Sequence, residues 1–300
     1  MNRLSDSNEI TRKYLDSILI KERLIDSDLP DTSIELFGRS FSTPICTAAL
    51  SHMSKTCPGG MSELAEGAKS ANAVNFCGME EYEGELDEIA KVKAATIRII
   101  KPHANNDDVF KRIEHAKELG VFGLGMDIDH AFNACGGYDT VEGLPMRPKT
   151  SQELESFVKA AGELPFIIKG VLSVEDTLKC VEIGAKGIVV SHHHGIMPYA
   201  IPPLYILPEI KAAVKNKLTI FVDCNIESGA DVYKALCLGA DAVCLGRALI
   251  EPLGKNKSLG VSEKIKAIND ELSSLMARTG YHTLSELNSD CLVRFEHSII

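Results

Sequence analysis

Eight short apolar runs, separated by longer segments with helical periodicity, constrain the fold of this chain more than any other feature of its sequence. Helical segments such as 173–183 and 228–238 lie between the runs. Strands that alternate with helices form parallel sheets, because two parallel strands need a long crossover connection. The predicted strands span residues 44–50, 73–77, 95–101, 121–128, 165–169, 187–191, 218–223 and 242–246.

The number of strands favours a closed barrel over an open sheet. A barrel of eight strands and eight helices needs about 250 residues in one domain, and this chain has 300 residues, 45% of them hydrophobic. A doubly wound sheet would carry a glycine fingerprint after its first strand, and none follows residues 44–50. We therefore predict an α/β fold: a single (β/α)8 TIM barrel in residues 41–300, with a short helical N-terminal extension, residues 1–40, packed on the barrel.

Two helix-to-strand junctions have closely similar sequences, CVEIGAKGIVV at 180–190 and ALCLGADAVCL at 235–245. Glycine just after a helix adopts positive φ without the steric cost that a side chain would bring. We expect Gly184 and Gly239 to end their helices in this way. The repetition supports a repeated βα unit.

Composition excludes several classes of partner. The net charge is −10, with no concentrated basic stretch, which argues against nucleic acid and anionic membrane surfaces. No run reaches the roughly 18–20 apolar residues that cross a bilayer. The nine cysteines include no CxxC pair, and no apolar signal segment precedes them. We expect a cytoplasmic protein that acts on a small molecule.

Polar residues gather where the predicted strands end. In an eight-stranded barrel the loops after the strands converge on one face, which carries the active site. Six of the nine histidines fall in this set, so the sequence predicts a polar catalytic mouth. The set comprises His52, Cys77, Lys101, His103, Asp127, Asp129, His130, Lys169, Ser191, His192, His193, His194, Asp223, Gly246 and Arg247.

Two of these positions carry a specific chemical expectation. Lys169 closes an apolar strand, where a buried ammonium group is costly unless it is paired. Gly246 and Arg247 follow the last strand, where backbone N–H groups, a helix N-terminus and a guanidinium group can bind a phosphate. The loops after strands seven and eight are the recurring phosphate site of this fold.

Several segments resemble the FMN-dependent 2-hydroxy-acid oxidases and dehydrogenases, a family that includes glycolate oxidase, lactate oxidase and the flavocytochrome type of L-lactate dehydrogenase. The similarity is densest from residue 165 to 247. The matching segments are PICTA at 44–48, IKGV at 168–171, VSHH at 190–193, FVD at 221–223, SGADVYKAL at 228–236, LGR at 245–247 and MARTGYHTLS at 276–285.

The resemblance implies FMN as cofactor, a small-molecule substrate and a homo-oligomer. It also implies that Lys169 neutralises negative charge on the reduced flavin and that His193 is the base acting on the substrate. We assign catalysis to His193, Lys169 and Asp129, and assign no metal ligand. Expected cofactor contacts are Ala48, Ala49, Cys77, Arg98, Asp127, Lys169, Ser191, Asp223, Asn225, Gly246 and Arg247.

The departures from the family pattern concern both ends of the site. Ile196 stands where the family has an arginine that clamps the substrate carboxylate, so a lactate-like substrate would lose its anchor. Glu227 stands where the family has an arginine that contacts the FMN phosphate, which opposes binding of a dianion. We therefore expect FMN to be weakly bound.

Three further departures fall on the predicted strands 95–101 and 121–128. Arg98 matches the place of a flavin-contacting glutamine, Ile100 that of a tyrosine, and Asp127 that of a flavin-contacting threonine. Strand periodicity directs Arg98 and Asp127 inward. We expect these two charges to pair, because either one alone in a barrel interior is costly.

The sequence favours an FMN-dependent oxidoreductase acting on a small hydroxy or amino substrate that lacks the usual carboxylate–arginine anchor. One alternative is a metal-dependent lyase or hydrolase that uses His52, His103, Asp129 and residues 192–194 as ligands. Another is a non-catalytic barrel that binds a phosphorylated ligand through Gly246 and Arg247.

Overall fold

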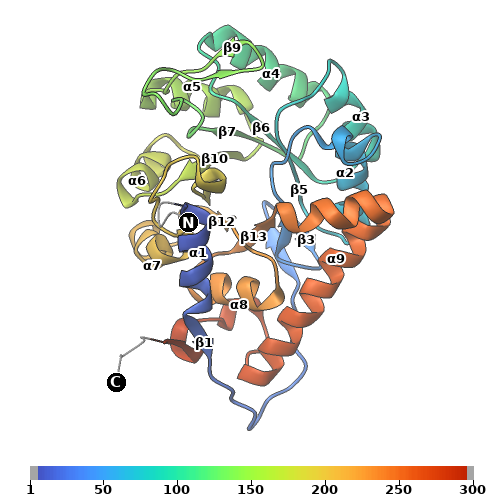
Figure 1. The fold of residues 1–300 in the computed structure, drawn as a ribbon, viewed down its shortest axis with the longest axis vertical. Helices are drawn as coiled ribbons and strands as arrows, with labels where there is room; N and C mark the ends of the chain where they lie inside the picture. Colours follow the sequence, from blue (N-terminus) through green and yellow to red (C-terminus); the bar gives the residue numbers. More distant parts are fainter. Residues whose placement is uncertain (1–5, 296–300) are drawn as a thin grey trace.

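The computed structural model describes residues 6–295, and its centre is an eight-stranded barrel (Figure 1). All neighbouring strands that pair in the sheet are parallel. The two ends of the sheet meet through a hydrogen bond from the Thr47 amide to the Val74 carbonyl and a bridge between Leu50 and Cys77. In spatial order the strands are β4 (Ile45–Thr47), β13 (Ala242–Leu245), β12 (Thr219–Val222), β11 (Gly187–Val190), β10 (Phe166–Val171), β7 (Gly123–Asp127), β6 (Thr96–Ile100) and β5 (Asn75–Cys77).

A helix follows every barrel strand, so the predicted (β/α)8 fold is confirmed. The last helix is long and has two non-helical residues, Asn256 and Lys257, near its start. In chain order the helices are α2 (Gly60–Ser70), α3 (Glu85–Val92), α4 (Asn106–Glu118), α5 (Ser151–Ala161), α6 (Val174–Glu182), α7 (Pro203–Val214), α8 (Gly229–Cys237) and α9 (Ile250–Thr279).

Local signals in the sequence explain where these helices begin and end. Ser173 and Ser228 cap α6 and α8, each accepting a hydrogen bond from a backbone amide of the first turn. Gly184 and Gly239 follow the same two helices with φ of +82° and +114°. Both glycines therefore have the conformation predicted from the repeated junction.

Strand alternation divides the apolar residues into two cores. Inside the barrel, Ile97, Ile99, Ile167 and Phe221 belong to a smaller cluster. A larger cluster fills the layer between the strands and the helices. Each strand therefore sends alternate residues toward the barrel axis, and a residue just past the end of a strand can reach the barrel mouth.

The N-terminal segment contacts both ends of the barrel. A hairpin of β2 (Ile34–Leu36) and β3 (Arg39–Phe41) covers one end, where Phe37 and Phe41 contact Phe122 just before β7. The helix α1 (Ser7–Asp16) contacts the loop after β11 at the opposite end. Between them, β1 (Ile18–Ile20) pairs with β14 (Leu292–Arg294).

The loop between β7 and α5 spans residues 128–150 and contains a small hairpin of β8 (Thr140–Val141) and β9 (Leu144–Pro145). It lies at the end of the barrel where the strands terminate. Within residues 6–295, no helix combines the length and the apolar character that crossing a membrane requires.

Candidate active site

Lys169 and Asp127 form the centre of the site. They are register partners on β10 and β7, and the Nζ–Oδ1 distance is 3.1 Å. Lys101, one residue past the end of β6, places its Nζ 2.6 Å from the other oxygen of Asp127. Burial opposes ionisation of Asp127, but the two ammonium groups outweigh it and hold the pKa of Asp127 well below its usual range.

Lys169 is buried, and it is paired as the sequence required. Besides Asp127, its ammonium group lies 4.0 Å from Oδ2 of Asp223, at the end of β12. Burial alone would lower the pKa of Lys169, but the carboxylates of Asp127 and Asp223 raise it above its ordinary value. Lys169 therefore stays charged throughout the physiological pH range.

His193 lies in a short 3-10 turn after β11, with a left-handed φ of +46°. Its backbone amide donates to the hydroxyl of Ser191, at 3.0 Å, which holds this turn against the barrel. Its Nδ1 lies 2.9 Å from Oδ1 of Asp129 and 3.3 Å from Oδ1 of Asp127. Because carboxylates only accept hydrogen bonds, Nδ1 carries a proton and Nε2 is the nitrogen left for acid–base chemistry.

Burial acts to lower the pKa of His193, but Asp127 and Asp129 outweigh it and raise that pKa above its usual value. The nearby ammonium group of Lys169, 3.1 Å from Nδ1, opposes this effect. The imidazole is thus held between two carboxylates and one cation.

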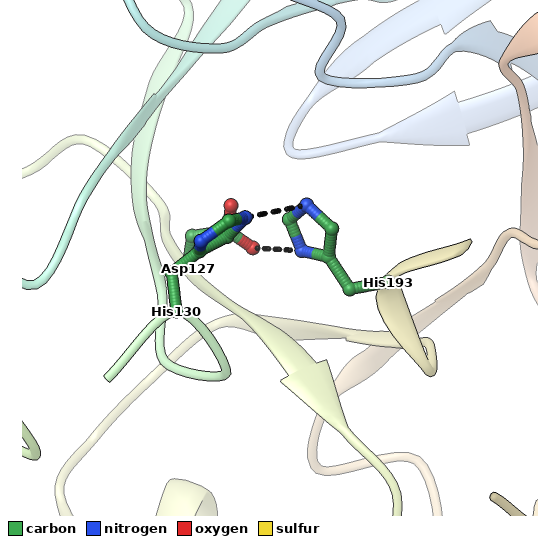
Figure 2. A group of neighbouring side chains, drawn as sticks. All are labelled: Asp127, His130 and His193. Atoms are coloured by element: carbon green, nitrogen blue, oxygen red, sulfur yellow. Dashed lines mark hydrogen bonds and ion pairs between the residues drawn. The ribbon is translucent and has the colours of Figure 1, made fainter. Parts of the chain in front are cut away.

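A second histidine, His130, contacts the first. Its Nε2 lies 3.0 Å from Nε2 of His193 (Figure 2). Its Nδ1 lies 3.3 Å from Oδ2 of Asp139. The sequence placed His130 in the mouth but assigned it no role. The one sequence signal for His130 as a site residue is its position three residues after Asp127, because its contact with His193 spans 63 residues of chain.

The arrangement of Asp127, His130 and His193 could also hold a metal ion, since one ligand atom from each lies within 4.8 Å of the others. Two ammonium groups oppose a divalent cation there, at 2.6 and 3.1 Å from the oxygens of Asp127. Of the ligands that the metal-dependent alternative would use, Asp129 and His193 meet, but His52 and His103 do not join them. His52 pairs with Glu142, and His103 is buried beneath the loop, where its backbone bridges to Met146.

The other two members of the histidine run point away from Lys169. His192 is buried against Thr11 of α1, with Nε2 2.8 Å from the threonine hydroxyl oxygen. His194 is exposed and contacts Asn8 of the same helix. His193 is therefore the one histidine of the run that enters the cluster around Asp127.

One cavity connects this cluster with the end of β13. Ala48, Ala49, Lys169, His193, Asp223, Asn225, Gly246 and Arg247 all line it. Gly246 lies beside Ala48, where an added Cβ would be 3.7 Å from the Ala48 side chain. Arg247 is exposed at the far end and donates hydrogen bonds to Asn225 and Asn8.

The turn after Asp223 has an unusual backbone. Cys224 and Asn225 adopt φ of +71° and +59°, a left-handed conformation that favours glycine. Neither residue is glycine, so the turn takes a glycine-like shape without glycine. Such strain persists where the surrounding structure enforces it, and it concentrates at functional sites.

Glu227 lines the same cavity, is exposed, and its carboxylate has no hydrogen bond or ion pair to any described residue. Its backbone amide donates to Asp231, which Arg12 also binds through both terminal nitrogens. A negative charge therefore remains at the end of the cavity where Gly246 and Arg247 lie.

Four of the residues expected to contact the cofactor do not line this cavity. Asp127 and Ser191 lie behind its lining residues, bonded to Lys169 and His193. Arg98 faces the helix layer, and it pairs with Glu80 at 3.1 Å instead of Asp127. Cys77 is fully buried in the same layer. The predicted pairing of Arg98 with Asp127 is wrong because the inward-facing positions of β6 are shifted by one residue from those expected. Ile99 and Lys101 point inward, and Arg98 and Ile100 point outward.

Comparison with known proteins identifies the family. The family model described as FMN-dependent dehydrogenase matches residues 5–163 and 150–294. This chain belongs to the FMN-dependent dehydrogenase family. The expected family, cofactor class and oxidoreductase activity are thereby confirmed, and the lyase, hydrolase and binding-module alternatives gain no support.

Individual relatives agree with this assignment. The chain is 25% identical to a 2-hydroxyacid oxidase of Dictyostelium discoideum, over 91% of this chain and 79% of the relative. It is 36% identical to the FMN-dependent alpha-hydroxy acid dehydrogenase qulF of Penicillium citrinum, over 64% of this chain but only 46% of the relative. A crystal structure of mandelate oxidase superposes with a TM-score of 0.86 at 27% identity, covering 96% of this chain and 90% of that one.

The cavity of this family member fits FMN. The Lys169–His193 cluster and the Gly246–Arg247 end both line it, as do Cys224 and Asn225 of the left-handed turn. The end expected to bind the phosphate fits less well, because Glu227 lines the same cavity as Arg247.

Proposed function

We propose that this family member oxidises a small hydroxy or amino compound that carries no carboxylate beside the reacting carbon. The observation behind the proposal is the cluster of His193, Asp129, Asp127 and Lys169, which opens onto the same cavity as Gly246 and Arg247. A base and a phosphate-binding end in one cavity suit a flavin enzyme.

The roles we propose follow from the contacts. Asp129 accepts from Nδ1 of His193 and orients the imidazole, so that Nε2 can take a proton from the substrate. Lys169 keeps a positive charge buried beside the base. FMN, when bound, accepts the two electrons that leave the substrate. Gly246, Arg247 and Asn225 would hold its phosphate, and Lys169, Ala48 and Ala49 would face its ring system.

The substrate class follows from the charges around the base. Ile196, at the family's carboxylate clamp, is 41% exposed and offers no hydrogen bond from its side chain. Lys101 and Lys169 are both paired with Asp127, and Arg98 is paired elsewhere. Because a charged hydrogen bond contributes about 1.5–3 kcal/mol, a carboxylate substrate would lose much of its binding energy here.

The test is a comparison of matched substrates with the FMN-loaded protein. Mandelate and its amide differ only at the carboxylate, as do lactate and lactamide. We expect the neutral member of each pair to bleach the flavin band at about 450 nm faster. Faster reduction by the carboxylates would contradict the substrate class, and no reduction by any hydroxy or amino compound would contradict the proposed function.

We further propose a homo-oligomer in the cytoplasm. The nine cysteines all lie in the described part of the chain and none forms a disulfide, as in a reducing compartment. Light scattering on the eluting protein tests the assembly. A mass equal to one chain would contradict the oligomer.

A further inference from the structure

His130 contacts the nitrogen of His193 that acid–base chemistry needs. The two imidazole rings meet edge to face, with centroids 4.2 Å apart and an interplanar angle of 83°. Nε2 of His193 faces Nε2 of His130 at 3.0 Å, as Figure 2 shows. Any proton on that nitrogen is therefore shared with a second imidazole.

The loop after β7 holds His130 in this position. Asn133 accepts hydrogen bonds from the amides of Cys135 and Gly137, which closes a tight turn. The amide of Asp139 then donates to the carbonyl of Ala131, at 3.1 Å. The turn brings Asp139 back beside His130, so the contact is built by the loop.

The charges around the pair decide where the proton resides. His193 faces Asp127, Asp129 and Lys169, while His130 faces Asp139 and, at longer range, Lys101 and Asp127. Burial, Lys101 and His193 lower the pKa of His130, whereas Asp127 and Asp129 raise that of His193. When the pair holds one extra proton, after His193 has acted as base, His193 is therefore its favoured site, and neutral His130 accepts at Nε2 while its Nδ1–H faces Asp139.

We propose that His130 and Asp139 form the path by which a proton leaves His193, a role that rests on the proposed function of His193 as base. The proton passes from Nε2 of His193 to Nε2 of His130, and the proton on Nδ1 of His130 passes to Oδ2 of Asp139. Water then removes it, because the Asp139 side chain is 22% exposed. No electrons move, one proton enters and one leaves, and His130 regains its Nδ1–H tautomer by proton exchange with water, because its own side chain is 21% exposed.

The path has a consequence for turnover. Each oxidation leaves a proton on His193, and the base must lose it before the next cycle. Lys169 and the carboxylates on the Nδ1 side stabilise the protonated ring without offering an exit, since Asp129 and Asp127 are nearly buried. His130 is a positioning and proton-transfer residue that connects Nε2 of the partly exposed base with Asp139 and solvent.

The experiment needs no substrate. Solvent exchange of the imidazole N–H protons is measured by NMR on the FMN-loaded protein, selectively labelled at histidine. Asp139→Asn keeps an acceptor for Nδ1–H of His130 but cannot take the proton. We expect exchange at Nε2 of His193 to slow at least about tenfold in this variant, because a positioned acid or base contributes roughly 10²–10⁴-fold to a proton-transfer step.

His130→Gln keeps a polar side chain but breaks the relay. We expect the pH titration of the His193 ring in this variant to follow a simple one-proton curve, because no second imidazole shares its proton. His115→Gln is the control, because His115 is a half-buried histidine paired with Asp87 on the outer helices. Unchanged exchange in Asp139→Asn, or an unchanged His193 titration in His130→Gln, would overturn the relay. If stoichiometric binding of Zn²⁺ to the wild type blocks this exchange, the relay is also overturned, in favour of a metal site.

A steady-state arm separates this inference from the proposed function. With a compound that reduces the flavin, His130→Gln and Asp139→Asn should lower kcat more than kcat/KM, since they delay the reset of the base. If no compound reduces the flavin of the wild type, the proposed function is wrong. The exchange measurement still tests the relay in that case.

Discussion

The free carboxylate oxygen of Asp129 lies against Gly170, where a Cβ would come within 2.4 Å of Oδ2. That oxygen is buried and has no hydrogen-bond partner among residues 6–295. Gly170 also has a φ of +91°, so the position requires glycine on two grounds. The residue after Lys169 thus makes room for the carboxylate that orients His193.

Gly170→Ala should displace Asp129 and weaken its hydrogen bond to His193. We expect flavin reduction to slow at least about tenfold, because misplacing a catalytic group by a small distance is costly. Stopped-flow absorbance measures the rate. Gly184→Ala is the control: it has a similar φ of +82° but its added Cβ would meet only ordinary contact, at 3.8 Å. Equal losses in both variants would mean that backbone strain alone is responsible.

Lys169→Ala should abolish turnover and leave the barrel folded, because Lys101 still pairs with Asp127. We expect a loss of stability of about 1–3 kcal/mol, less than for a buried charge left with no partner. Flavin reduction and urea unfolding measure the two effects. Lys179→Ala, which removes an exposed ion pair on α6, serves as control. Full activity in Lys169→Ala would remove this lysine from the mechanism.

Glu227→Arg should raise the affinity for FMN at least about tenfold, equivalent to 1.4 kcal/mol. The change replaces an anion by a cation in the cavity that also contains Arg247. Fluorescence titration of flavin into the apoprotein gives the dissociation constants. Glu182→Arg makes the same change in net charge at an exposed site on α6. Equal affinities of wild type and Glu227→Arg would show that Glu227 points away from the phosphate.

His103 should make the folded state sensitive to mild acid. Burial, with Arg112 nearby, lowers the pKa of His103 to about 4. An unfolded chain takes up this proton at about pH 6.5 and the folded chain does not, so stability falls as the pH drops from that value toward 4. Denaturant unfolding at several pH values should show a shallower decline in His103→Gln. An identical decline in both proteins would exclude His103 as the source.

The family resemblance and the strand pattern together predicted most of the fold and part of the site. Apolar runs, capping serines and glycines act over a few residues, so Ser173, Gly184 and Gly239 could be interpreted from their neighbours alone. The strand-end positions of Lys169, Asp223 and Gly246 followed from the same pattern, and all three line one cavity.

Register was harder to predict from the sequence. On β6 an error of one residue exchanged the inward and outward faces, which placed Arg98 in the cavity and left Lys101 without an assigned partner. Short strands buried on both faces carry no polar alternation that would fix the phase.

The sequence by itself determined the barrel, the family and the residue types available at its mouth, because these depend on local periodicity and short matching segments. Only the tertiary structure decided which of those residues meet. The contacts of His193 with Asp129 and His130 cross 64 and 63 residues of chain. Barrel closure and the fold of the loop after β7 create them, and neither leaves a pattern in neighbouring residues. The partner of each charge is therefore a property of the closed barrel.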